Sequence, residues 1–185
     1  MSFGYSVLGF GSRPLADAGQ YFGGRAVFMG GTVAPKDTID YVAIGTPGNA
    51  SDFGNCTGDL VAYPMCQTNA SRAIASGLNT AGAAQGETGS DAIEYVTIGT
   101  TGNATDFGGV MTIGRSTAAG VSGGGRGIVG GGGPVLNTID FVTISTGADA
   151  QDFGDLTAGR YHFTGTSDGS RGLFCGGYYP QQNTI

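Results

Sequence analysis

The stretch Thr138-Ile139-Asp140-Phe141-Val142-Thr143-Ile144, followed shortly by Asp152-Phe153-Gly154, decides the architecture because the chain repeats it. The other copies are Thr38–Ile44 with Asp52-Phe53-Gly54, Ala92–Ile98 with Asp106-Phe107-Gly108, and a fourth that begins at Asn183-Thr184-Ile185. Successive copies lie 54, 46 and 46 residues apart. A repeat of this length marks a supersecondary unit that cannot bury its apolar face alone and stacks on its neighbours.

A second series of short apolar runs lies between these copies. Three of the runs begin with an arginine and end in a glycine pair: Arg25–Gly31, Arg126–Gly131 and Arg171–Gly177. The segment Ser71–Gly77 is a degraded copy. Together with the Asp-Phe-Gly blocks, these runs predict four short antiparallel strands in each unit. This pattern favours a propeller blade over a solenoid rung.

The composition agrees with an all-β chain. Among 185 residues, 38 are glycine and 12% are charged, which is typical of many tight turns between closely packed strands. No stretch shows sustained helical periodicity. We therefore expect a docking segment or strand at 1–12, and one repeat domain at 13–185. The units of that domain span about 13–60, 61–114, 115–159 and 160–185.

The order of these landmarks resembles Kelch-type propeller repeats, with an arginine-led first strand and a second strand ending in Gly-Gly. In place of the usual fourth-strand tryptophan stand Phe53, Phe107 and Phe153, and the second unit lacks the glycine pair. The wording Asn-Thr-Ile-Asp-Phe-Val-Thr-Ile, with Asp-Phe-Gly-Asp-Leu-Thr after it, is similar to Gly-rich Kelch-like repeats in tail-fibre and appendage proteins of marine bacteriophages. The start of the chain, Ser2–Gly11, also looks like the N-terminus of phage virion proteins.

This resemblance implies a β-propeller of four-stranded antiparallel blades. Two arrangements stay open: a closed ring of about four blades, in which Phe3–Phe10 supplies a missing strand, or part of a larger propeller. The implied function is that of a non-enzymatic virion protein in a tail fibre, neck or surface appendage, used for attachment or host-surface binding. Its implied partners are other virion proteins, with a host-surface glycan and further copies of the chain as additional candidates.

Charge and hydropathy limit the alternatives. A net charge of −6 and a single lysine, Lys36, argue against nucleic-acid binding. The sequence contains no run of 18 apolar residues, so no membrane-spanning segment is predicted, and the start of the chain lacks the pattern of a secretory signal. We therefore expect a virion protein that is assembled in the host cytoplasm. The alternative is a cellular carbohydrate-binding or adhesion module, and an enzyme is not expected.

The polar residues that recur once in each unit are interpreted as structural. Asp52, Asp106 and Asp152 are expected to bind nearby backbone amides, because a catalytic acid needs one special environment rather than three equivalent ones. The recurring arginines, Arg115 with Arg160 and Arg126 with Arg171, are expected to bind backbone carbonyls or the Asp-Phe-Gly carboxylates between blades.

Few residues remain as site candidates. No catalytic, cofactor or metal site is predicted, since His162 is the only histidine. Cys56 and Cys66 are close enough in sequence to form a disulfide, while Cys175 is interpreted as a buried thiol. Tyr21, Tyr178 and Tyr179 lie in predicted loops, where exposed tyrosines could stack on sugars or anchor a protein contact.

Overall fold

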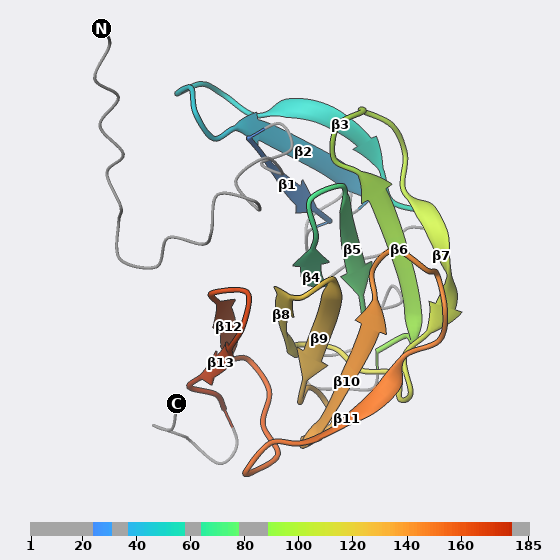
Figure 1. Ribbon diagram of the computed structural model, residues 1–185, viewed down its shortest axis with the longest axis vertical. Coiled ribbons are helices and arrows are strands. Elements are labelled where there is room, and N and C mark those ends of the chain that lie inside the picture. Colours follow the sequence, from blue (N-terminus) through green and yellow to red (C-terminus); the bar gives the residue numbers. More distant parts are fainter. Residues whose placement is uncertain (1–23, 31–36, 58–63, 78–88, 179–185) are drawn as a thin grey trace, which may run out of the picture.

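The described residues of the computed structural model, 24–30, 37–57, 64–77 and 89–178, form strands and turns without a helix (Figure 1). The all-β prediction is therefore confirmed for this part of the chain. Its strands are β1 (Arg25–Met29), β2 (Thr38–Ala43), β3 (Ser51–Asn55), β4 (Met65–Thr68), β5 (Arg72–Ser76), β6 (Ala92–Thr97), β7 (Thr105–Val110), β8 (Ala119–Gly123), β9 (Arg126–Gly130), β10 (Thr138–Thr143), β11 (Gln151–Asp155), β12 (Thr164–Ser167) and β13 (Gly172–Cys175).

Each predicted unit contributes one small antiparallel sheet. The strand orders are β1-β2-β3, β4-β5-β6-β7, β8-β9-β10-β11 and β12-β13, so every sheet is a simple meander. The sheets follow one another along a curved row, with β4, β8 and β12 on its concave side and β3, β7 and β11 on its convex side (Figure 1). Strand β8 packs against both β4 and β12. In the described residues this row is an open arc.

The Asp-Phe-Gly block forms the same irregularity in each of the three sheets that contain it. The pairing register shifts just before the third-strand acid, and that acid then lies opposite the aspartate of the block, as Asp140 does opposite Asp152. The glycine of the block accommodates the extra residue of this bulge by adopting a positive φ, which is +133° at Gly154. The carboxylate of Asp152 accepts a hydrogen bond from the Gly154 amide at 3.1 Å, and Asp106 binds Gly108 likewise at 2.9 Å. The predicted backbone-binding role is therefore confirmed for these two aspartates.

The hydrophobic core lies between the sheets. One cluster joins Met29, Ile39, Phe53 and Cys56 of the first unit to Ala75, Val96 and Ala104 of the second. The next cluster joins Met65, Ile74, Ile93, Phe107 and Met111 of the second unit to Val129, Val142 and Ile144 of the third. Among the described residues, the first three units thus bury apolar side chains against their neighbours, as the repeat length predicts.

Candidate functional site

The most highly organised polar contacts of this protein lie between successive units. The connection after β6 binds the convex-side strand of the preceding sheet, β3. The Gly102 amide donates to the Phe53 carbonyl at 2.7 Å, and the Ala104 amide donates to the Asn55 carbonyl at 2.8 Å. The amide of Asn55 in turn donates to Oδ1 of Asn103 at 3.1 Å. This connection therefore extends the first sheet by main-chain hydrogen bonds.

The same arrangement recurs one unit later, between the connection after β10 and strand β7. The Ala150 amide donates to the Val110 carbonyl at 2.8 Å, and the Val110 amide donates to Oδ1 of Asp149 at 3.1 Å. Asp149 lies one repeat after Asn103, and its Oδ1 likewise accepts a backbone amide of the preceding unit. The loop between the third and fourth strands is thus a recurrent clasp on the preceding unit.

A buried carboxylate of the third strand forms a second recurrent contact. Oε2 of Glu94 accepts hydrogen bonds from the amide and the hydroxyl of Thr57, both at 2.8 Å. Asp140 accepts the equivalent bonds from Thr112, at 3.1 Å from the amide and 2.7 Å from the hydroxyl. Both acids are fully buried, so these hydrogen bonds offset the cost of removing their charge from water.

In the third unit Asp140 also forms an ion pair. Its Oδ2 lies 2.8 Å from Nη2 of Arg115, and both side chains are buried. The Arg115 guanidinium further donates to the carbonyls of Gly131 and Thr138. Burial lowers the pKa of Arg115 from its ordinary value, and the adjacent Asp140 carboxylate opposes that shift. This pair therefore fixes the start of the third unit to its own third strand.

A different arginine, at the start of the second strand, reaches into the following unit. The guanidinium of Arg25 donates to the Ile98 carbonyl at 3.0 Å, and that of Arg72 donates to the Ile144 carbonyl at 3.2 Å. Each of these arginines also stacks on a tyrosine of its own sheet, at 4.6 Å for Tyr41 and 4.4 Å for Tyr95.

The predicted role of the four recurring arginines is met in part. Arg115 and Arg160 bind backbone carbonyls within their own units, Arg160 through the carbonyl of Phe174 at 3.2 Å. Arg126 stacks on Phe141 at 4.6 Å. The binding of a carbonyl between units is carried instead by Arg25 and Arg72.

The glycine pairs of the third and fourth units leave space for the buried Arg160. At Gly131, with a φ of +60°, a Cβ would lie 2.6 Å from the Arg160 carbonyl. At Gly177 a Cβ would lie 2.9 Å from the Arg160 side chain. The roles of Thr57, Thr112, Glu94 and Asp140 were not predicted from the sequence, although a threonine shortly after the Asp-Phe-Gly block and an acid in the third strand recur in the first three units.

The individually predicted site residues have mixed outcomes. Tyr178 is exposed, and its ring packs edge-on against Tyr161 at 5.5 Å between centroids. Tyr21 and Tyr179 lie outside the described residues. The disulfide is a correction: Cys56 and Cys66 are both free, with Cys56 buried in the core and Cys66 exposed on β4. Burial first, and the neighbouring Glu94 second, raise the pKa of the Cys56 thiol above its ordinary range.

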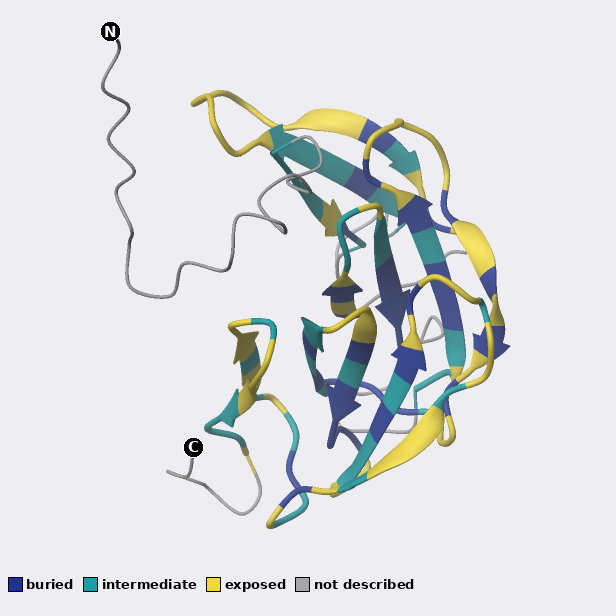
Figure 2. Ribbon diagram, in the orientation of Figure 1, coloured by how far each residue is buried: buried dark blue, intermediate teal, exposed yellow. Residues whose placement is uncertain are grey.

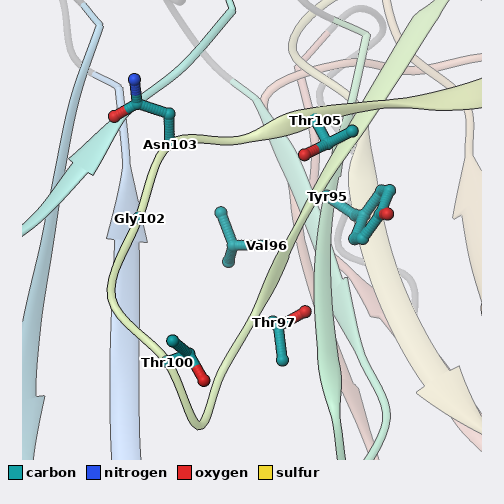
Figure 3. Close-up of a pocket in the computed structure, with 7 residues that line it drawn as sticks. All are labelled: Tyr95, Val96, Thr97, Thr100, Gly102, Asn103 and Thr105. Carbon is teal, nitrogen blue, oxygen red and sulfur yellow. The ribbon is translucent and has the colours of Figure 1, made fainter.

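A shallow hollow of about 360 Å³ lies within the hairpin formed by β6 and β7 (Figure 3). It is lined by Tyr95, Val96, Thr97, Thr100, Gly102, Asn103 and Thr105. The lining contains hydroxyl and amide groups but no charged side chain. Such a surface suits a neutral, polar ligand better than a phosphate or a metal ion.

Neither the known family models nor the curated proteins contain a match to this chain. Within the described ranges no three metal-ligating side chains cluster together, and no helix long and apolar enough to cross a membrane is present. The contacts themselves are therefore the basis for a functional proposal.

Proposed function

We propose that this protein is a non-enzymatic structural component of a phage virion, built as a Kelch-like β-propeller whose blades are the repeated units. The meander order of each sheet, running from the concave to the convex side of the row, supports the propeller arrangement. The resemblance of the repeats to phage tail-fibre and appendage proteins supports the virion role. In this proposal the propeller is a rigid element of a tail fibre, neck or surface appendage.

One observation carries the non-enzymatic part of the proposal: the recurring polar side chains are engaged in holding the units together. Glu94 and Asp140 are buried and bonded to threonines of the preceding unit. A glycan-cleaving enzyme instead needs two non-equivalent carboxylates, roughly 5 to 9.5 Å apart across an open groove. Carboxylates enclosed in this way serve cohesion between units.

The test is whether the polypeptide belongs to assembled particles. Particles from a lysate would be purified on a density gradient and analysed by quantitative mass spectrometry, with immunogold labelling by antibodies against this chain. We expect the polypeptide to follow the particles at a fixed copy number and to be labelled at one place on them. Its absence from intact particles, with recovery in the cell-surface fraction, would favour the cellular adhesion module instead.

Glycan binding is a second proposed role, and the hollow of Figure 3 favours it. Tyr95 and three threonines give the hollow the mixture of aromatic and hydroxyl groups that sugars bind. A glycan array probed with the wild-type chain and with Thr97→Val tests this role. The matched control is Thr143→Val, the exposed equivalent of Thr97 in the third unit. We expect binding that Thr97→Val weakens and Thr143→Val leaves unchanged; equal binding by all three chains would remove the hollow as the site.

A further inference from the structure

The hollow within the β6-β7 hairpin has a cation beside it. Arg72 lies directly opposite Thr97 in the pairing of β5 with β6, and its guanidinium carbon is 4.4 Å from the centre of the Tyr95 ring. Thr97 and Tyr95 both line the hollow (Figure 3). The connection that borders the hollow is exposed over residues 99–103 (Figure 2). A ligand that enters the hollow from solvent therefore lies close to a positive charge.

The Arg72 guanidinium has unused hydrogen-bond donors on one edge. Its Nη1 donates to the Ile144 carbonyl at 3.2 Å and its face stacks on Tyr95, so the position of the group is fixed. Within the described part of the chain, Nε and Nη2 make no hydrogen bond and no carboxylate pairs with the group. The side chain is only half-buried, and neither nitrogen is sealed from solvent. Nε and Nη2 together form a fork that fits a planar carboxylate through two parallel hydrogen bonds.

Arg115 provides the contrast, because the same donors are occupied there. Its Nε donates to the Ile113 carbonyl at 3.3 Å, and its Nη2 donates to Oδ2 of Asp140 at 2.8 Å. Both partners of that ion pair are buried, so Arg115 has no donor left for a ligand. Arg72 presents its fork beside an open hollow, where partial burial strengthens a charge interaction relative to water.

Among the three described hairpins that join a third and a fourth strand, only that of the second unit combines these features. The first unit has Ala43 at the position of Thr97, so that hydroxyl is missing. The third unit has Asp149 at the position of Asn103. The charge of Asp149 would repel a carboxylate, whereas the amide of Asn103 does not. The combination of arginine, hydroxyl groups and a neutral amide therefore belongs to the second unit.

We propose that the hollow and the Nε–Nη2 edge of Arg72 together bind a uronic acid residue of a glycan. Its carboxylate accepts hydrogen bonds from Arg72, and its hydroxyl groups bind in the hollow, where Thr97, Thr100 and Thr105 are the available partners. The uncharged lining suits the sugar ring, and one cation beside it matches the one carboxylate that each uronic acid carries. This inference rests on the proposed glycan-binding role and names the class of glycan.

The test titrates oligosaccharides of galacturonic, glucuronic and mannuronic acid into the full chain by calorimetry, each beside its own methyl ester. The ester keeps the sugar skeleton and its hydroxyl groups and removes the negative charge. We expect at least one acid to bind about tenfold more tightly than its ester, the usual effect of hydrogen bonds to a charged group. Equal binding of acid and ester would overturn the inference and leave the glycan-binding role standing. Binding of neither form would also overturn it, while the glycan array decides the glycan-binding role separately.

Arg72→Gln tests whether this guanidinium recognises the charge. We expect the tenfold preference for the acid over its ester to disappear in this variant. The matched control is Arg25→Gln, because Arg25 makes the same contacts one unit earlier, with the Ile98 carbonyl and the Tyr41 ring. That control is expected to keep the preference. Acid and ester are titrated into the same preparation, so a partly unfolded fraction does not change their ratio.

A second variant, Asn103→Asp, keeps the clasp and adds the charge that the third unit carries. The new carboxylate can still accept the Asn55 amide, as Asp149 accepts that of Val110. We expect Asn103→Asp to weaken binding of the acid about threefold through like-charge repulsion and to leave binding of the ester unchanged. Asn49→Asp, at the same position of the first unit, is the control and is expected to have no effect. A preference for the acid that survives both Arg72→Gln and Asn103→Asp would overturn the assignment.

Discussion

The Arg115 guanidinium and the Asp140 carboxylate lie 2.8 Å apart and are both enclosed by protein. The same carboxylate accepts the amide and hydroxyl hydrogens of Thr112, which follows the last strand of the preceding unit. Asp140 therefore joins three segments, namely the start of its own unit, its third strand and the end of its neighbour. Replacing this carboxylate by a neutral amide leaves the Arg115 cation buried without its counter-charge and replaces one of the two acceptor oxygens by a donor.

Asp140→Asn is accordingly expected to lower the free energy of unfolding by about 3–5 kcal/mol, the usual cost of breaking a buried ion pair. The matched control is Asp152→Asn in the same unit, an exposed residue whose side-chain oxygen binds the Gly154 amide in either form. That control is expected to change stability by less than about 0.5 kcal/mol. Urea denaturation of both variants provides the comparison, and equal losses would show that Asp140 has no special role.

Arg72→Lys tests the arginine contact between units. Lysine keeps the charge and can still approach Tyr95, but it lacks the planar guanidinium that reaches the Ile144 carbonyl. We expect the free energy of unfolding to fall by about 1.5 kcal/mol. Arg126→Lys is the control, because Arg126 stacks on Phe141 in the same way without a described carbonyl acceptor in a following unit. A loss for Arg126→Lys as large as that for Arg72→Lys would contradict the interpretation of the Ile144 contact.

The buried thiol of Cys56 makes stability depend on alkaline pH. Its pKa is raised above the ordinary value of 9.0, so the folded chain keeps this proton when the unfolded chain releases it. The contribution of Cys56 is therefore fully present below about pH 9 and is lost as the pH rises further. Wild type should lose stability between pH 8 and pH 10 more steeply than Cys56→Ala, as followed by denaturant melts. Parallel pH profiles for the two chains would show that the thiol is not buried as described.

Recurrence within the sequence predicted much of this structure. The β-strands, the backbone contact of the Asp-Phe-Gly aspartates and part of the structural role of the arginines could be predicted, because each depends on residues close in sequence or repeated once in each unit. The carboxylate contacts could not be paired in this way. Thr57 and Glu94 are 37 residues apart, and Thr112 and Asp140 are 28 apart, so the spacing is not constant and only the packed sheets show which groups meet.

The exposure of Phe153 cannot be predicted from the local sequence. Phe107 and Phe153 occupy the same Asp-Phe-Gly block, and each packs edge-on against the aromatic residue of the adjacent third strand. Among the described residues, the connection of a following unit covers Phe107, and no such connection covers Phe153. A repeat pattern specifies the contact that a residue can make, while the neighbouring unit decides whether the contact is made.

The burial of each unit by its neighbour is tested most directly by comparing the free energy of unfolding of Phe107→Ala with that of Phe153→Ala. Phe107 is sealed between two units, so its truncation is expected to cost about 3–5 kcal/mol. Phe153 is half exposed, so its truncation is expected to cost less than about 1 kcal/mol in the isolated chain. Equal losses at the two positions would contradict the claim that the unit that follows is what buries the phenylalanine of the Asp-Phe-Gly block.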